Sequence, residues 1–209
     1  MRLVLASNNA GKLAELQALF VSLPVELVTQ SSLGVAEAPE PHATFVENAL
    51  AKARHAAQAT GSAAIADDSG LCVACLGGAP GVASAHYAAV DLPPGERETR
   101  RALQDAANND KLLQAMARHD DRRARFVSVL VALRHAGDPE PLIAFGRWEG
   151  EILREPRGTG GFGYDPLMFI AALGRSVAEL DAATKNRASH RALAAAGMAN
   201  LMRGAWQLG

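Results

Sequence analysis

The stretch Ile65-Ala66-Asp67-Asp68-Ser69-Gly70 organises the rest of the chain, because it joins an apolar run to two adjacent carboxylates. The apolar lead-in, which begins at Ala63, predicts the buried end of a strand, and Gly70 permits a sharp turn after it. Adjacent carboxylates repel each other unless a cation or hydrogen-bond donors compensate their charge. Mg²⁺ is the usual compensating ion, since it prefers carboxylate oxygens and also binds phosphates. A solvated turn explains this stretch equally well, because Asp, Ser and Gly are common turn residues.

The composition is that of an ordinary globular protein. The chain has 209 residues, enough for one sizeable core, with 21 basic and 22 acidic side chains and a formal net charge of -1. This balance gives no reason to expect a polynucleotide or an anionic membrane as a partner. No apolar run reaches the roughly 20 residues that span a bilayer. Because Met1 to Ala6 lacks a signal-peptide layout, we expect a cytoplasmic protein.

The two cysteines, Cys72 and Cys75, have the C-x-x-C spacing of a redox pair or of half a metal site. They lie within Leu71–Leu76, which predicts a strand, and positions three apart on a strand point to opposite faces. No second cysteine pair exists to complete a zinc site. We therefore expect two small buried residues.

A second polar stretch, Ser7-Asn8-Asn9-Ala10-Gly11-Lys12, follows the apolar run Arg2–Ala6. Apolar residues then recur at helical spacing up to Phe20. A strand, a glycine-containing turn and a helix start form an anion site, because free amides and the helix dipole favour negative charge there. The turn is not a Walker loop, since the first glycine of that motif is absent. Taken alone, Ser-Asn-Asn is better explained as a helix cap.

The segment Thr44-Phe45-Val46-Glu47 fits a capping box and predicts a helix that ends at Gly61. Asn48 and Lys52 lie four apart on one face of this helix and could point at a ligand, although a solvated face is the default interpretation. The preceding loop carries Glu40. A third carboxylate near Asp67 and Asp68 would complete a Mg²⁺ site.

The second half of the chain predicts a hairpin. Arg122–Leu133 alternates between two faces, and Leu142–Trp148 returns after a turn, which indicates a long antiparallel pair. Asp91–Glu98 is expected to be a surface loop, and Asn109–Met116 a helix. The order of elements favours an α/β fold with a mixed sheet, in two lobes with a cleft between them.

Two further stretches are rich in glycine or in cations. Gly158-Thr159-Gly160-Gly161-Phe162-Gly163-Tyr164-Asp165-Pro166 offers aromatic rings that could stack on a base and a carboxylate that could accept hydrogen bonds from it. Its alternative is a glycine-rich turn with a core aromatic, but loops carry function disproportionately. Lys185–Arg191 places cations before the expected helix Ala192–Met202, where the helix dipole disfavours them. Taken alone, this segment is better explained as a charged first turn of the helix, but the mismatch with the dipole indicates a role beyond structure.

Together, four segments resemble the inosine/xanthosine triphosphate pyrophosphatase family. They are Ser7–Lys12, Ala66–Gly70, Gly160–Pro166, and Lys185 with Ser189-His190-Arg191. Each motif is weak alone, but the four in this order are highly specific, and the resemblance runs from Leu3 to about Leu201. One departure is Glu40-Pro41-His42, where family members often have Glu-Thr-Gly.

The resemblance implies Mg²⁺-dependent hydrolysis of ITP, dITP and XTP to the monophosphate and pyrophosphate, which removes non-standard purine nucleotides from the pool. It also implies a homodimer, and one domain over residues 1–209 with an elongated two-lobed fold around a mixed, twisted sheet. Asp68 would be the catalytic carboxylate and a metal ligand, with Glu40 as a second ligand. Substrate contacts would come from Ser7, Asn8, Asn9, Ala10, Gly11, Lys12 and Ser69 on the phosphate side, and from Phe162, Gly163, Tyr164, Asp165, Lys185, His190 and Arg191 around the base.

Two alternatives remain open at this point. One is a nucleotide pyrophosphatase that prefers another base, such as a modified pyrimidine, and a panel of bases separates it from the leading hypothesis. The other is a nucleotide-sensing module that binds without turnover. Paired Asp67 and Asp68 argue against this second alternative, because an anion binder gains little from them without a metal.

Overall fold

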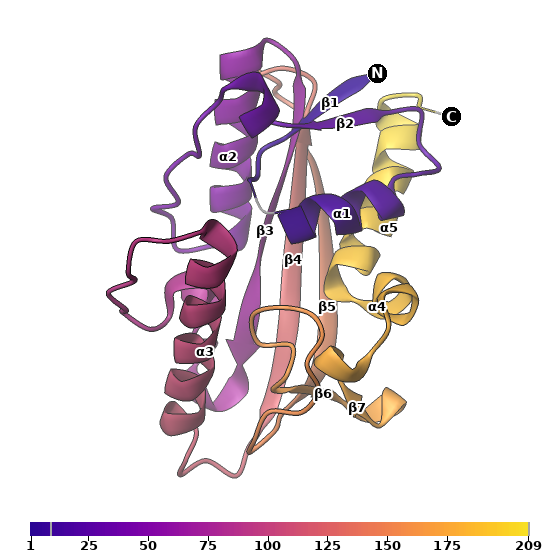
Figure 1. The fold of residues 1–209 in the computed structure, drawn as a ribbon. Helices are drawn as coiled ribbons and strands as arrows, with labels where there is room; N and C mark the ends of the chain where they lie inside the picture. The colour runs from indigo at the N-terminus through magenta and orange to yellow at the C-terminus, as the bar shows by residue number, and fades with distance from the viewer. Residues whose placement is uncertain (9, 209) are drawn as a thin grey trace. The chain divides into compact units, whose positions relative to one another are not determined.

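The structure, a computed structural model, describes residues 1–8 and 10–208, and of Ala10 it describes the backbone only. Its α-helices are α1 (Ala10–Leu19), α2 (Phe45–Thr60), α3 (Arg97–Ala115), α4 (Ala182–Ala188) and α5 (His190–Ala205). Its strands are β1 (Arg2–Leu5), β2 (Glu26–Thr29), β3 (Ala63–Val73), β4 (Arg123–Leu133), β5 (Leu142–Ile152), β6 (Met168–Ile170) and β7 (Arg175–Ser176). Figure 1 shows these elements along the chain. None of the helices in the described part of the chain is long and apolar enough to cross a bilayer.

The strands of the described residues form one mixed sheet in the order β2-β1-β3-β4-β5-β6-β7. β1 pairs in parallel with both β2 and β3, whereas β6 pairs antiparallel with β5 and β7. β4 and β5 are long sheet neighbours of 11 residues each. The predicted α/β class with a mixed sheet is therefore confirmed.

The chain divides into two compact units. The first unit comprises Met1–Ser69, Ser128–Arg147 and Asn186–Gly209, and the second comprises Gly70–Val127 and Trp148–Lys185. β3, β4 and β5 each contribute residues to both units. Within the first unit, β1, β3, β4 and β5 share a core with α1 and α5, made of residues such as Leu5, Leu16, Ile65, Leu130, Ala144 and Met198.

The central strand β3 differs from its prediction. The carboxylates were expected at the end of a strand with a sharp turn after Gly70, or in a solvated turn, but β3 runs without a break from Ala63 to Val73. Gly70 is absent from the glycines with positive φ, so it extends the strand and does not turn the chain. The carboxylates of Asp67 and Asp68 are buried within the strand because neighbouring cations compensate them.

The cysteines also differ from their prediction. The predicted strand Leu71–Leu76 is wrong in its second half, because a 3-10 helix over Ala74–Leu76 follows β3 and ends at Gly77 with φ +62°. Cys75 lies in that helix, and both cysteines are half-buried free thiols rather than buried residues. Gly77, which has a left-handed backbone conformation, ends the short helix. The hydrophobic pattern alone did not reveal that the strand ends before this helix.

The helix α2 begins and ends where the sequence predicts. Oγ1 of Thr44 accepts a hydrogen bond from the amide of Glu47, and Gly61 caps the other end with φ +62°. The default of a solvated face for Asn48 and Lys52 is wrong, since these side chains are 1% and 7% exposed. The side-chain amide of Asn48 accepts a hydrogen bond from the backbone N–H of His42 and donates one to its carbonyl. These two bonds fix the preceding loop to the helix.

The helix α3 begins at Arg97 and not at Asn109, so the predicted boundary is wrong. It lacks an apolar stripe before Leu112, because its buried residues up to that point are the polar Gln104 and Asn108. Asn108 accepts hydrogen bonds from the amide of Ala88 at 2.8 Å and from Gln104 at 3.0 Å. Hydrogen bonds therefore stabilise this buried polar face of α3. Hydrophobic periodicity could not detect the face, because it registers only apolar residues.

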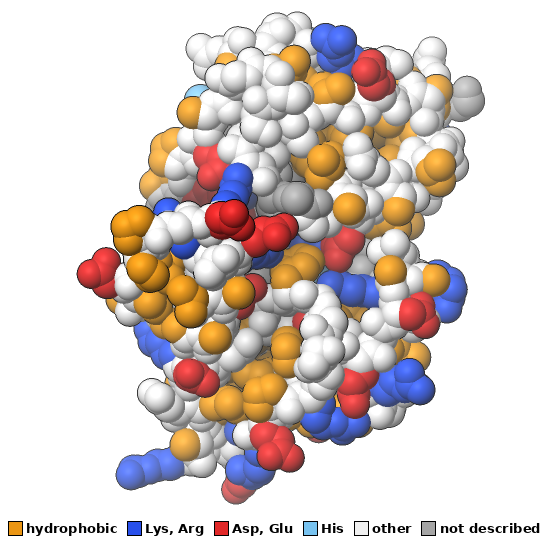
Figure 2. Space-filling view, viewed as in Figure 1, with side chains coloured by type: hydrophobic (Ala, Val, Ile, Leu, Met, Phe, Trp, Pro, Cys, Tyr) orange, Lys and Arg blue, Asp and Glu red, His pale blue; other side chains and the backbone are white. Residues whose placement is uncertain are grey.

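The C-terminal helix starts earlier than predicted, and a short helix that was not predicted precedes it. Lys185 lies in the short helix α4, and α5 begins at His190 rather than at Ala192. Ser189 caps α5, since its hydroxyl accepts a hydrogen bond from the amide of Ala192 at 3.1 Å. His190 and Arg191 therefore belong to the first turn of α5. On the face shown in Figure 2, acidic and basic side chains are interspersed, in line with the net charge of -1.

Candidate active site

Asp67 is a buried carboxylate of the first unit, and its partners are two cations and hydroxyl groups. Its Oδ2 lies 2.9 Å from Nζ of Lys12 and 3.3 Å from Nε of Arg191, and its Oδ1 accepts a 2.7 Å hydrogen bond from Ser128. Burial alone would raise the pKa of Asp67, but the charges of Lys12 and Arg191 outweigh it and hold the pKa far below its usual range. Asp67 is thus a permanent anion, and both of its oxygens already accept hydrogen bonds.

Asp68, the next residue of β3, has a different environment. Its Oδ1 accepts a 2.9 Å hydrogen bond from Nζ of Lys52, whereas its Oδ2 is buried and accepts none from the residues described. Burial raises the pKa of Asp68 to about 6, although Lys52 acts in the opposite direction. A carboxylate with a pKa close to neutrality and one free oxygen has the properties of a general base.

Lys52 joins Asp68 to Glu40. Its Nζ lies 3.2 Å from Oε1 of Glu40 and donates to the carbonyl oxygen of Asp67 at 3.1 Å. Burial would lower the pKa of Lys52, but Asp68 and Glu40 outweigh it and the pKa is raised. The structure thus brings Glu40 and Asp68 to one cation, in keeping with their predicted proximity.

These carboxylates fit a metal ion that is shared with substrate. In the described part of the chain, no three His, Cys, Asp or Glu side chains are placed to hold a metal by themselves. Mg²⁺ does not need such a cage, because it is commonly bound by one or two carboxylates together with substrate phosphates and water. The buried, donor-free Oδ2 of Asp68 supplies an oxygen of the preferred type, and the half-exposed Glu40 can supply a second.

The predicted phosphate segment Ser7–Lys12 lies at the start of α1. Within it, Asn9 lies outside the described residues. Nζ of Lys12 donates to the carbonyl of Asp67 at 3.3 Å as well as to its carboxylate, so Asp67 fixes the position of this ammonium. Burial lowers the pKa of Lys12, and Asp67 opposes that shift. Oδ1 of Asn8 is buried and receives no hydrogen bond from a described residue.

Arg191 reaches the same cluster from α5. Its side chain is 2% exposed, its Nη1 pairs with Glu15, and its Nη2 donates to Oγ of Ser69 at 3.0 Å. Ser69 in turn donates to Asp67 at 3.0 Å. His190, also predicted as a base contact, is buried beside Arg191 in the first turn of α5. The described contacts of Arg191 are with carboxylates and the Ser69 hydroxyl, and a contact between either residue and a base stays a prediction.

The second unit holds the predicted base loop. Nζ of Lys185 lies 4.5 Å and Cζ of Arg101 lies 4.6 Å from the centre of the Phe162 ring. Oδ2 of Asp165 accepts hydrogen bonds from Nζ of Lys185 at 2.8 Å and from the amide of Phe162 at 2.9 Å. Phe162, Asp165 and Lys185 therefore meet as the sequence predicted, around an aromatic ring flanked by cations.

The glycines of this loop have a steric role. Gly161 has φ +74°, and a Cβ there would collide with Oδ2 of Asp165. The hydroxyl of Tyr164 donates to the carbonyl of Ser84 at 2.9 Å, and burial raises the pKa of Tyr164 above its usual value. Tyr164 thus anchors the loop to the interior of the second unit. Its predicted contact with a base remains a prediction.

Three residues of α3 that sequence reasoning missed also position the loop. Oδ2 of Asp105 accepts from the amide of Gly163 at 2.8 Å, and Nδ2 of Asn109 donates to the carbonyl of Gly163 at 3.0 Å. Arg101, Asp105 and Asn109 are spaced four apart, so they share one helix face. This spacing could have revealed the shared helix face from the sequence. It did not, because α3 was predicted to start only at Asn109. Lys52 was noticed in the sequence but left out of the predicted site, since a solvated face was the default interpretation.

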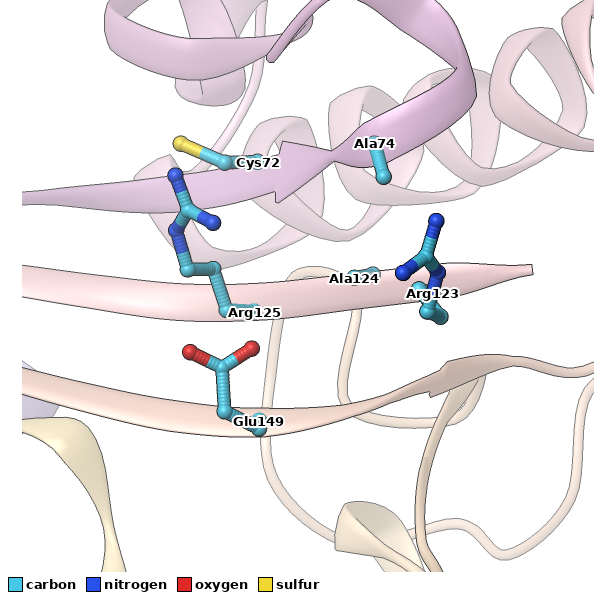
Figure 3. Close-up of a pocket in the computed structure, with 6 residues that line it drawn as sticks. All are labelled: Cys72, Ala74, Arg123, Ala124, Arg125 and Glu149. Carbon is cyan, nitrogen blue, oxygen red and sulfur yellow. The ribbon is translucent and has the colours of Figure 1, made fainter. Parts of the chain in front are cut away.

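A hollow elsewhere in the second unit contains none of the predicted site residues. It is lined by Cys72, Ala74, Arg123, Ala124, Arg125 and Glu149 (Figure 3). Arg123, Arg125 and Glu149 are exposed, and Arg123 is paired with Asp121 at 2.8 Å. This hollow is an open part of the surface, without a buried polar group aimed into it among the residues that line it.

Comparison with known proteins identifies the family. Residues 3–201 match the model of the Ham1 family. A dITP/XTP pyrophosphatase of Methylibium petroleiphilum is 72% identical over 206 residues, which cover 99% of this chain and 99% of the relative. A second dITP/XTP pyrophosphatase, from Leptothrix cholodnii, is 66% identical over 211 residues and covers 100% of both chains. The solved structure of a HAM1 protein from Coxiella burnetii is 44% identical and superimposes with a TM-score of 0.86 over 97% of this chain and 98% of that one.

These matches extend over nearly the whole chain and confirm the resemblance that the four sequence segments indicated. Their sequence identities are far higher than a shared fold alone would produce. The chain belongs to the Ham1 family.

Proposed function

We propose that this chain hydrolyses dITP, XTP and ITP to the nucleoside monophosphate and pyrophosphate, with Mg²⁺ as cofactor. Its membership of the Ham1 family and its identity of 72% with a dITP/XTP pyrophosphatase support a nucleoside triphosphate pyrophosphatase. The observation that carries the chemical proposal is the asymmetry of Asp68, which has one oxygen bonded to Lys52 and one buried oxygen without a described donor.

In this proposal, Asp68 acts as the general base. A carboxylate with a pKa raised to about 6 is largely ionised at neutral pH before the reaction. It can then accept a proton from the attacking water. The 2.9 Å hydrogen bond from Lys52 holds Oδ1, so Oδ2 keeps a fixed direction towards the place that Mg²⁺ and the attacking water would share. Mg²⁺, when bound by Asp68 and Glu40, would neutralise phosphate charge and make the α-phosphorus easier to attack.

The phosphates are assigned to the first unit. Lys12 supplies a positive charge that Asp67 holds in place, and the backbone amides near the start of α1 supply donors. Asp67 is not assigned to the metal, because both of its oxygens are already engaged by Lys12, Arg191 and Ser128. Its role in the proposal is to fix cations beside Asp68.

The base is assigned to the second unit. Phe162 offers a ring for stacking, and Lys185 offers donors to the 6-oxo group of hypoxanthine or xanthine. Adenine carries an amino group at that edge, so it would leave these donors unpaired, which costs about 1–3 kcal/mol per group. Asp165 holds Lys185 at 2.8 Å and thereby fixes the direction of the donors. We also propose that the protein is a cytoplasmic homodimer with no polynucleotide or membrane partner.

The proposal is tested by measuring pyrophosphate release from a panel of triphosphates at fixed Mg²⁺. We expect rapid release from dITP, ITP and XTP, and release from dATP and dCTP slower by at least about tenfold, as the unpaired donors imply. Faster release of pyrophosphate from a modified pyrimidine triphosphate than from dITP would contradict the assigned purine preference. Binding of dITP without pyrophosphate at any Mg²⁺ concentration would support the nucleotide-sensing alternative.

A further inference from the structure

The strand β5 carries a glycine where α5 begins beside it (Figure 1). A Cβ built on Gly146 would overlap the carbonyl oxygen of His190 and lie 2.6 Å from the backbone nitrogen of Ala194. Both atoms belong to the backbone of α5, so no side-chain rotation can relieve the overlap. The first turn of α5 can therefore lie this close to β5 only if residue 146 has no side chain.

This requirement concerns space and not backbone conformation. Gly146 is absent from the glycines with positive φ, so an alanine could adopt its dihedral angles. To restore an ordinary contact distance of about 3.5 Å to both atoms, the start of α5 would have to move by roughly 1–2 Å. Gly197 faces the same strand from α5, but its Cβ would meet only Cβ of Ala144, at the ordinary distance of 3.6 Å.

The first turn of α5 carries the most deeply buried cation of the first unit's cluster. Nε of Arg191 lies 3.3 Å from Oδ2 of Asp67, and its Nη2 lies 3.0 Å from Oγ of Ser69. A separation of 3.3 Å is already at the long end for an N–H···O bond, so a displacement of roughly 1 Å would break it. Asp67 would then keep Lys12 and lose its second cationic partner.

We propose that Gly146 is a positioning residue, which lets α5 approach β5 closely enough for Arg191 to bind Asp67 and hold it beside Asp68. The nearest atoms to a Cβ on Gly146 all belong to the backbone of α5. Gly146 acts through Arg191 on Asp67, and through Asp67 on the ammonium of Lys12. The effect on catalysis rests on the proposed function, whereas the effect on Arg191 does not.

The first test observes Arg191 directly. In protein labelled with ¹⁵N-arginine, the Nε–H resonance of Arg191 is assigned by its loss in Arg191→Lys. Gly146→Ala should shift this resonance and speed its exchange with solvent, because the bond to Asp67 is lost, whereas Gly197→Ala should leave it unchanged. An unchanged Arg191 resonance in Gly146→Ala would overturn the inference, whatever reaction the protein catalyses.

The second test asks whether Gly146 acts through Arg191 in catalysis. Gly146→Ala should lower kcat/KM for dITP by about tenfold to hundredfold, as expected for a displacement of roughly 1–2 Å, while Gly197→Ala stays within about twofold of the unaltered chain. In an Arg191→Lys background, the effect of Gly146→Ala should fall below about threefold, because the residues share one pathway. Equal losses in both backgrounds would contradict the inference.

A further variant covers the case in which Gly146→Ala does not fold. Ser189→Ala removes the capping bond to the amide of Ala192 and loosens the same turn of α5 without an overlap. The Arg191 resonance should then shift in Ser189→Ala, and an unchanged resonance would overturn the inference. Failure of the proposed function appears separately, as an unaltered chain that hydrolyses no triphosphate while the arginine resonances still respond.

Discussion

Lys52 binds one oxygen of Asp68 at 2.9 Å and leaves the other oxygen buried without a described donor. The carboxylate is therefore oriented by one oxygen and available through the other. Neither oxygen of its neighbour Asp67 is left without a donor, since both accept hydrogen bonds. Two adjacent aspartates in one strand thus differ in their contacts, which is the basis for proposing a chemical role for Asp68 and a cation-holding role for Asp67.

Replacement of Asp68 by asparagine should abolish turnover. Asp68→Asn keeps the shape of the side chain but removes its basicity and its charge for Mg²⁺, so we expect kcat for dITP to fall by at least about a thousandfold. Pyrophosphate release measures this loss, and circular dichroism checks the fold. Asp121→Asn, at a half-buried position paired with Arg123, serves as the control and should retain activity. Activity of Asp68→Asn within tenfold of the unaltered chain would remove Asp68 from the mechanism.

The same variant should change how stability depends on pH. Burial raises the pKa of Asp68 to about 6, above the ordinary value of about 3.9, so the folded state binds more protons than the unfolded state between these values. The contribution of protonated Asp68 is present below about pH 4 and is lost as the pH rises through about 6. The neutral amide in Asp68→Asn has no proton to lose over this range.

Urea denaturation in buffer without Mg²⁺ measures this difference. The free energy of unfolding of Asp68→Asn, relative to the unaltered chain, should increase between pH 4.5 and pH 7.5. A difference that is constant over this range would show that Asp68 has an ordinary pKa in the folded state.

Lys12 should contribute to triphosphate binding. Lys12→Ala removes a charge-assisted donor worth about 1.5–3 kcal/mol, so we expect KM for dITP to rise by roughly tenfold to hundredfold. Competitive inhibition by dIMP, which lacks the outer phosphates, should change much less. Lys111→Ala, at an exposed position in the second unit, is the matched control. Equal losses for triphosphate and monophosphate would argue against a phosphate role for Lys12.

Phe162 should contribute through stacking on the base. Phe162→Ala should cost about 1–3 kcal/mol of binding, seen as a rise in KM for dITP, because base stacking on an aromatic ring is worth this amount. Phe162→Tyr should retain most of the affinity, and Phe145→Ala, at a residue 49% exposed in the first unit, should leave it unchanged. If Phe162→Ala raises KM no more than Phe145→Ala does, the base does not stack on Phe162.

Local sequence signals predicted the elements that local chemistry determines. The cap at Thr44 and the left-handed Gly61 set the ends of α2, and both were readable from residue types. The same holds for the loop around Phe162, where the close approach of Asp165 requires a glycine at position 161.

Elements that depend on distant partners could not be predicted in this way. β3 continues through Asp67 and Asp68 only because Lys12, Lys52 and Arg191 reach it from three separate helices. No local pattern reports that compensation, so a turn was the reasonable expectation. Similarly, the first half of α3 is held by hydrogen bonds to buried amides, which carry no hydrophobic period.

The central claim is that Asp68 directs water to the α-phosphorus. Hydrolysis of dITP in H₂¹⁸O with Mg²⁺, followed by mass spectrometry of both products, tests it most directly. We predict one ¹⁸O atom in dIMP and none in pyrophosphate, with labelled dIMP formed at least about a thousandfold more slowly by Asp68→Asn. Label in pyrophosphate, or products dIDP and phosphate, would place the attack at another phosphorus and contradict the claim.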